Sequence, residues 1–134
     1  MNEIILSTIP FLMDGLLMTF KISLLTIFFG SLIGVVVGML RSLDYAVITY
    51  PLGAYIHALR GTPFLIHLYL VYFMLPMTGI SWLQLEAFPA AVIALSMYTS
   101  TYVAEIVRSA IQAVPRGQSE AARSTGMTAL QSMW

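Results

Sequence analysis

The stretch ISLLTIFFGSLIGVVVGML, residues 22–40, decides the fold class of this chain. It carries no charged side chain between Lys21 and Arg41. An α-helix rises about 1.5 Å per residue, so a helix over this stretch would extend roughly 28 Å, close to the ~30 Å hydrocarbon core of a bilayer. We therefore predict a first membrane span over residues 22–40.

The overall composition extends this prediction to the rest of the chain. Of the 134 residues, 59% are hydrophobic and 9% are charged, and the mean hydropathy is +0.88. An ordinary soluble domain has about 25% charged residues. Because the apolar pattern recurs along the whole length, we expect lipid rather than water around an all-α, polytopic membrane domain.

Two more apolar segments complete the three predicted spans. One covers residues 63–77 and the other covers residues 88–108, and each has a proline in its first turn, where proline is favoured. Residues 41–60 are too polar to cross with ease, and we predict an amphipathic helix at the membrane interface there. Residues 1–13 lack a basic segment and a cleavage pattern, which predicts a short interfacial or extracellular helix rather than a signal peptide.

The basic residues gather on one predicted side of the membrane. That side holds five of them, namely Arg41, Arg60, Arg108, Arg116 and Arg123, while the opposite side has only Lys21. Cytoplasmic segments are enriched in Lys and Arg. We therefore predict that the N-terminus lies outside the cytoplasm and that the segments carrying these arginines face it.

Several classes of function find no support in the sequence. The net charge is zero, without an isolated basic cluster, which argues against nucleic-acid binding. There is no cysteine for a disulfide, a thiolate metal site or a nucleophile, and His57 and His67 stand apart from other metal ligands. No phosphate-binding glycine loop or nucleophile elbow occurs. We expect no catalytic residue, no metal and no cofactor on this chain.

Three glycines recur at every fourth position of the first predicted span, at Gly30, Gly34 and Gly38. This spacing puts them on one helical face, where another helix can approach closely. The approaching helix can belong to the same chain, as internal packing, or to another copy, as an oligomer seam. The pattern alone leaves both interpretations open.

A polar band crosses the third predicted span at Ser96, Ser100 and Thr101. Hydroxyl groups in an otherwise apolar helix are candidates for lining a substrate path. Serine and threonine in membrane helices also bond to carbonyls of their own helix, so a purely local role stays open as well.

Near the end of the same span, Glu105 and Arg108 are neighbours at i and i+3. Such residues can form an ion pair and reach toward water at the membrane surface. We predict an ion pair at the cytoplasmic end. A carboxylate in this position can alternatively hold a donor from a partner.

The polar segment 115–126 is predicted to form a short cytoplasmic helix. Glu120, Ala121 and Ala122 favour helix, and Gly126 suits the C-terminal cap. Small alanine side chains leave a flat surface, which can dock into a groove of a partner protein.

Several of these segments resemble the permease subunits of ABC importers of the polar amino acid type. Glu120, Ala121 and Ala122, followed after three residues by Gly126, look like the EAA loop of that family. Further similar segments follow one another in the family's order, at residues 15–21, 60–63, 102–108 and 111–118. The family pattern often has glutamine where this chain has His67.

The resemblance implies a five-helix permease in the cell inner membrane, paired with itself or with a sister permease. It also implies two ATPase subunits that hold ATP and Mg²⁺, and a periplasmic or extracellular amino-acid-binding protein. Glu120, Ala121, Ala122 and Gly126 would be the residues that couple the permease to the ATPase. On this comparison, residues 1–134 are a partial permease domain that stops before the last two helices.

A rival hypothesis comes from another functional class. The chain would then be a truncated, non-transporting membrane anchor or regulatory protein that docks a partner through its C-terminal helix. The sequence neither identifies the amino acid that an importer would carry nor decides between a homodimer and a heterodimer of permeases.

Overall fold

The computed structural model describes residues 2–43, 45–128 and 131. The described residues form helices and no strand, which confirms the all-α prediction. The main helices are α1 (Asn2–Arg41), α2 (Ala46–Arg60), α3 (Phe64–Tyr69), α4 (Ala87–Gln112) and α5 (Arg116–Ser124). Between α3 and α4 lie the π-helical turn η1 (Leu70–Met74) and the 3-10 turns η2 (Pro76–Thr78) and η3 (Ser81–Leu83).

Helix α1 is one continuous helix that is longer than the first predicted span. Its membrane candidate covers Thr8–Arg41, so a separate short helix over residues 1–13 was the wrong expectation. Pro10 lies inside the helix, and Asp14 is an exposed residue that does not interrupt it. The surrounding residues are apolar, and in lipid each backbone group needs a partner within the helix, which favours continuation over a break.

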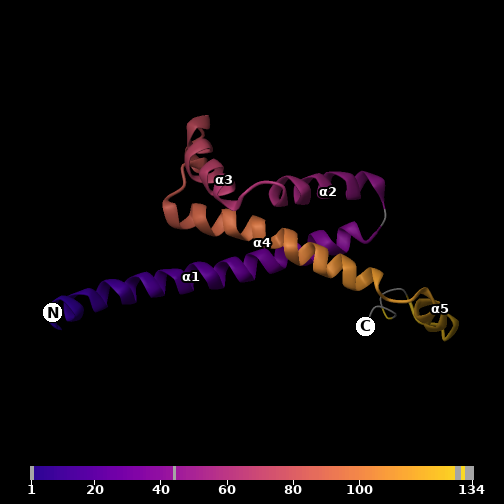
Figure 1. The fold of residues 1–134 in the computed structure, drawn as a ribbon. Helices are drawn as coiled ribbons and strands as arrows, with labels where there is room; N and C mark the ends of the chain where they lie inside the picture. Colours follow the sequence, from indigo (N-terminus) through magenta and orange to yellow (C-terminus); the bar gives the residue numbers. More distant parts are fainter. Residues whose placement is uncertain (1, 44, 129–130, 132–134) are drawn as a thin grey trace.

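Helices α1 and α4 pack against each other, cross at an angle and run in roughly the same direction (Figure 1). The three glycines of α1 meet successive turns of α4. A Cβ atom would lie 2.9 Å from Thr99 Cβ at Gly30, 2.8 Å from the Ser100 backbone oxygen at Gly34, and 2.6 Å from the Ala104 backbone oxygen at Gly38. The glycine face therefore packs within this chain, the first of the two interpretations left open by the sequence.

Helix α2 packs against both α1 and α4. Ile56 is buried with Val37 of α1 and Ala104 of α4. The Tyr55 hydroxyl lies 2.8 Å from Ser100 Oγ and 3.1 Å from the Met97 backbone oxygen. The predicted helix is therefore present, and its buried face covers neighbouring helices.

The chain bends sharply between α2 and α3. The segments Ala46–Arg60 and Phe64–Thr78 meet at 103°, and together they pass the length and hydropathy test for a span. Pro63 precedes α3, and proline disfavours helical geometry in the residue before it, so α2 cannot continue through Thr62. With α1 and α4 as the other two, this broken span gives up to three crossings, which is the predicted number. The predicted span over residues 63–77 covers only the second part of the broken one.

The bend lies beside the middle of α4. On the α2 side Tyr55 contacts Ser100, and on the α3 side the ring of His67 lies 5.9 Å from that of Tyr98. After the bend, α3 and η1 rise beside the first half of α4, where Val71 packs with Ala90 and Ala94. Pro76 begins the last turn of this segment, and Gly79, whose φ of 75° is left-handed, follows its end, as predicted.

Helix α5 stands apart from the crossed helices (Figure 1). Residues 113–115 connect it to α4, and within the described part of the chain it packs against no other helix. Its bounds, Arg116–Ser124, lie inside the predicted segment 115–126.

Candidate functional site

The C-terminal end of α5 has a complete Schellman cap built around Gly126. The amide of Met127 donates to the Ala122 oxygen at 3.1 Å, and the amide of Gly126 donates to the Arg123 oxygen at 3.0 Å. These are the two hydrogen bonds that define this cap, and the residue at its centre takes a left-handed conformation. Gly126 has a φ of 83°. Its role in this structure is to end α5 at a fixed position.

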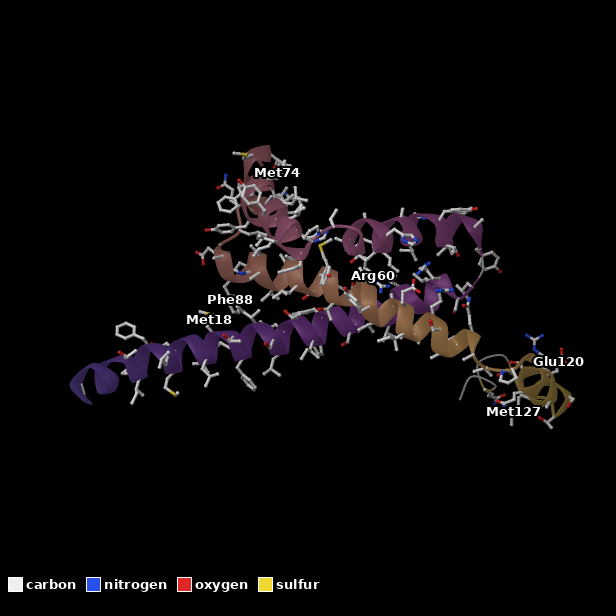
Figure 2. The ribbon with its side chains drawn as sticks, in the orientation of Figure 1. Met18, Arg60, Met74, Phe88, Glu120 and Met127 are labelled. Carbon is white, nitrogen blue, oxygen red and sulfur yellow. The ribbon has the colours of Figure 1, made fainter. Side chains whose placement is uncertain are left out.

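The residues of α5 that resemble the EAA loop lie at least partly on the protein surface. Glu120 and Ala121 are exposed, and Ala122 is half-buried. Figure 2 shows Glu120 on α5, beyond the end of the crossed helices. A notch of about 320 Å³ separates α5 from the end of α4, lined by Ile111, Val114, Ser119, Glu120 and Arg123. An exposed, capped helix with small side chains is suited to docking against another protein.

The hydroxyl groups of the third span are enclosed by helices. Ser100 and Thr101 are fully buried and Ser96 is 4% exposed. Ser100 Oγ donates to the Met97 oxygen and Thr101 Oγ1 to the Tyr98 oxygen, each at 2.7 Å. Both hydroxyls thus bond to carbonyls of their own helix, and Ser100 Oγ also lies 2.8 Å from the Tyr55 hydroxyl of α2. Ser96 Oγ is buried, has no hydrogen-bond partner among the described residues, and lines a small apolar cavity against α1.

Glu105 forms ion pairs with two arginines from two helices. Arg108 Nη2 lies 3.1 Å from Glu105 Oε2, which is the predicted i, i+3 pair. The sequence did not predict that Arg41, the last residue of α1, also contacts Glu105, through Oε1. A link between residues 41 and 105 depends on the crossing of α1 and α4, which no local pattern encodes.

A polar and aromatic cluster at the bend was missed by sequence reasoning. The guanidinium carbon of Arg60 lies 4.6 Å from the centre of the Tyr102 ring, a cation–π distance. The hydroxyls of Tyr98 and Tyr102 are 2.9 Å apart. Figure 2 places Arg60 where the end of α2 meets α4.

Arg60 is the last residue of α2, and its side chain is exposed in this chain. The bend that follows it lies beside the middle of α4. The local signal for this bend was the proline at position 63 between two apolar helices, because a helix break within a membrane has to be buried in protein or line a cavity. An ionisable residue beside such a break marks a candidate functional site.

His67 adds an unpaired acceptor to the same region. Thr62 Oγ1 donates to the Ala58 oxygen at 3.0 Å, so at 2.9 Å it accepts from His67 Nε2. This assigns the proton of the neutral ring to Nε2. His67 is 8% exposed, and its Nδ1 has no hydrogen-bond partner among the described residues.

An apolar cavity of about 500 Å³ opens on the other side of α3, between α1 and the start of α4. Met18 and Phe88 lie on facing sides of it (Figure 2). Its lining holds no Asp, Glu, Lys, Arg or His side chain, which suits lipid or another apolar helix rather than a polar solute. Among the described residues there is also no group of three His, Asp or Glu side chains placed to hold a metal ion.

The chain is similar to curated amino-acid permeases. It is 36% identical over 132 residues to the probable amino-acid ABC transporter permease protein YckA of Bacillus subtilis, covering 98% of this chain and 57% of that protein. It is 34% identical over 134 residues to the glutamate/aspartate import permease protein GltK of Escherichia coli, covering 96% of this chain and 60% of that one. The chain thus spans about three-fifths of the length of these relatives.

A solved structure and a family model agree with these relatives. The structure, described as the crystal structure of an amino acid ABC transporter with histidines, superposes with a TM-score of 0.83 at 40% identity, covering 96% of this chain and 59% of that one. The family model is that of the binding-protein-dependent transport system inner membrane component, and it matches residues 30–134. This chain therefore belongs to the family of binding-protein-dependent transport system inner membrane components.

Proposed function

We propose that this chain forms part of the permease subunit of an ATP-driven importer for polar amino acids, and that α5 docks on its ATPase subunit. The observation that carries the proposal is α5 itself, an exposed helix with Glu120 and Ala121 on its surface and a cap that ends it at Gly126. Three residues join it to α4, so a push on α5 reaches the membrane helices directly.

The proposal includes the partners and the orientation expected for such a subunit. ATP and Mg²⁺ would bind to the ATPase subunits, and an extracytoplasmic binding protein would deliver the amino acid to a pair of permeases. Arg41, Arg108, Arg116 and Arg123 still outnumber Lys21 after Arg60 is removed from the count. This supports α5 in the cytoplasm and the N-terminus outside it.

We further propose that Arg60 meets the carboxylate of the amino acid during its passage. The names of similar permeases refer to arginine, L-cystine and glutamate/aspartate, whose side chains differ but whose α-carboxylate is shared. A guanidinium binds a carboxylate through two parallel hydrogen bonds. Ser100 and Thr101 already bond to their own helix, so in this proposal the substrate path passes Arg60 rather than the serine and threonine band.

The docking role can be tested in the complete permease that contains this chain, assembled with its ATPase and binding protein in proteoliposomes. Glu120→Gln removes a charge that would accept hydrogen bonds from the ATPase, worth about 1.5–3 kcal/mol for a charged group. We expect the affinity for the ATPase to fall by roughly tenfold or more, with a parallel loss of uptake.

Ser119→Ala is the matched control, since Ser119 is the exposed neighbour of Glu120 on the same helix. It should leave both ATPase affinity and uptake unchanged. Unchanged ATPase affinity in the Glu120 variant would refute the docking role. An unaltered protein that binds the ATPase but takes up no amino acid would instead favour the membrane-anchor hypothesis.

A further inference from the structure

A chain of hydrogen bonds joins the last residue of α1 to the last residue of α4. Arg41 contacts Glu105 Oε1, and Arg108 reaches Oε2 with Nη2 at 3.1 Å and Nε at 3.3 Å. Arg108 Nη1 then donates to Gln112 Oε1 at 2.8 Å. Through Glu105, the ends of two helices far apart in the sequence are held by charged groups.

The contact between α1 and α4 is partly sheltered from solvent. The side chain of Arg41 is 10% exposed and that of Glu105 is 25% exposed. Helix α2 covers the guanidinium, since a Cβ atom at Gly53 would lie 3.8 Å from Arg41 Nη2. Removing one partner of a sheltered ion pair leaves the other charge without compensation, which makes such pairs more consequential than fully exposed ones.

The ion pair lies close to the end of α4 from which the chain continues to α5. In the described chain this is the only connection to α5. Helix α4 ends at Gln112 and α5 begins at Arg116, and α5 packs against no other described helix. A displacement of α5 therefore reaches the described membrane helices through the last turns of α4. Glu105 is two turns from that end, and it is the residue that connects α4 to α1 by charge.

We propose that Arg41 and Glu105 are positioning residues that make α1 move together with α4 when α5 is displaced. The proposal rests on the docking role of α5 given above. Without the ion pair, α4 would follow α5 while α1 lagged behind, and the ATPase would complete cycles that fail to move substrate. The expected defect is therefore a loss of coupling between ATP hydrolysis and transport.

The test uses the complete importer in proteoliposomes, with amino acid uptake and ATP hydrolysis measured in the same vesicles. Glu105→Gln and Arg41→Gln should each lower the amount transported per ATP by roughly fivefold or more, while ATP hydrolysis continues. Combining both substitutions should lower this ratio no further than Glu105→Gln alone, because that substitution already removes the carboxylate that Arg41 contacts. Arg41→Lys keeps the positive charge and should recover part of the ratio.

Asp14→Asn is the matched control, because it also removes one carboxylate but at an exposed site on the distant half of α1. Its ratio should equal that of the unaltered importer. An unchanged ratio in Glu105→Gln would overturn the proposal. The proposal would also be overturned if uptake and ATP hydrolysis fell in proportion to a smaller amount of folded protein. That result would mean that the ion pair only stabilises the fold. If the unaltered importer fails to transport, the proposed function itself is wrong.

Discussion

The backbone of Gly34 lies so close to Ser100 that a Cβ atom on Gly34 would be 2.8 Å from the Ser100 backbone oxygen and 2.5 Å from Val103 Cβ. Neither neighbour is the end of a flexible side chain, so even alanine requires the two helices to move apart. Helices α1 and α4 are thus in backbone-to-backbone contact at this point, and one hydrogen atom of glycine occupies the space between them.

Gly34→Ala should lower the free energy of unfolding by about 1–3 kcal/mol, the usual cost of overpacking. Gly15→Ala is the control in the same helix, since a Cβ atom there meets nothing within 4 Å. That substitution should be neutral or should raise stability by about 0.5–1 kcal/mol, because glycine is a poor helix former. Thermal unfolding in detergent micelles measures both, and equal shifts for the two variants would contradict the close contact.

Gly126→Ala should weaken the end of α5 without any steric clash. Its φ of 83° is costly for alanine, by roughly 1–2 kcal/mol, although a Cβ atom there has open space. We expect the affinity of the complete permease for its ATPase to fall about fivefold or more. Gly117→Ala on the same helix also meets open space and should leave the affinity at the unaltered level. Equal affinities in the two variants would show that the cap does not matter for docking.

Arg60→Gln should raise the KM of uptake by roughly tenfold or more, because it removes a charged hydrogen bond to the carboxylate. Arg60→Lys keeps the charge but loses the paired geometry, so its KM should lie in between. Competition with the decarboxylated amine of the same substrate makes the test specific. The unaltered importer should discriminate against this amine more strongly than the Gln variant does, and equal discrimination would refute the assignment.

Tyr55→Phe should destabilise the protein by about 0.5–1.5 kcal/mol, because α2 loses its hydrogen bonds to α4. Ser100 Oγ keeps its bond to the Met97 oxygen, so no buried hydroxyl is left unpaired by the change. Tyr50→Phe provides the control on the same helix, where the side chain is 79% exposed. Thermal unfolding that shifts equally in both variants would argue against the packing of α2 on α4.

Features that depend on neighbours in sequence were predictable. The charge-free run of residues 22–40 indicated a span, the four-residue spacing from Gly30 to Gly38 indicated a packing face, and Gly126 indicated the end of a helix. Each follows from helix geometry or from the conformational freedom of glycine, which act over a few residues. The i, i+3 relation of Glu105 and Arg108 belongs to the same class.

Features that depend on chain reversal were not predictable in this way. The side chain of Arg60 is exposed, but its contact with Tyr102 exists only after α2 has folded back along α4. Arg41 likewise finds Glu105 through the crossing of α1 and α4. The continuity of α1 through Asp14 was missed because one exposed charge was given too much weight against a long apolar helix.

The close contact at Gly34 and the ion pair at Arg41 together fix the direction of α1 relative to α4. They are two attachments to α4 that lie about 10 Å apart along α1, at 1.5 Å per residue. Met18 lies about 24 Å from Gly34 in the other direction. If the ion pair were lost and the Arg41 end of α1 shifted by about 1 Å relative to α4, the same tilt about Gly34 would shift Met18 by roughly 2 Å, beside the apolar cavity shared with Phe88.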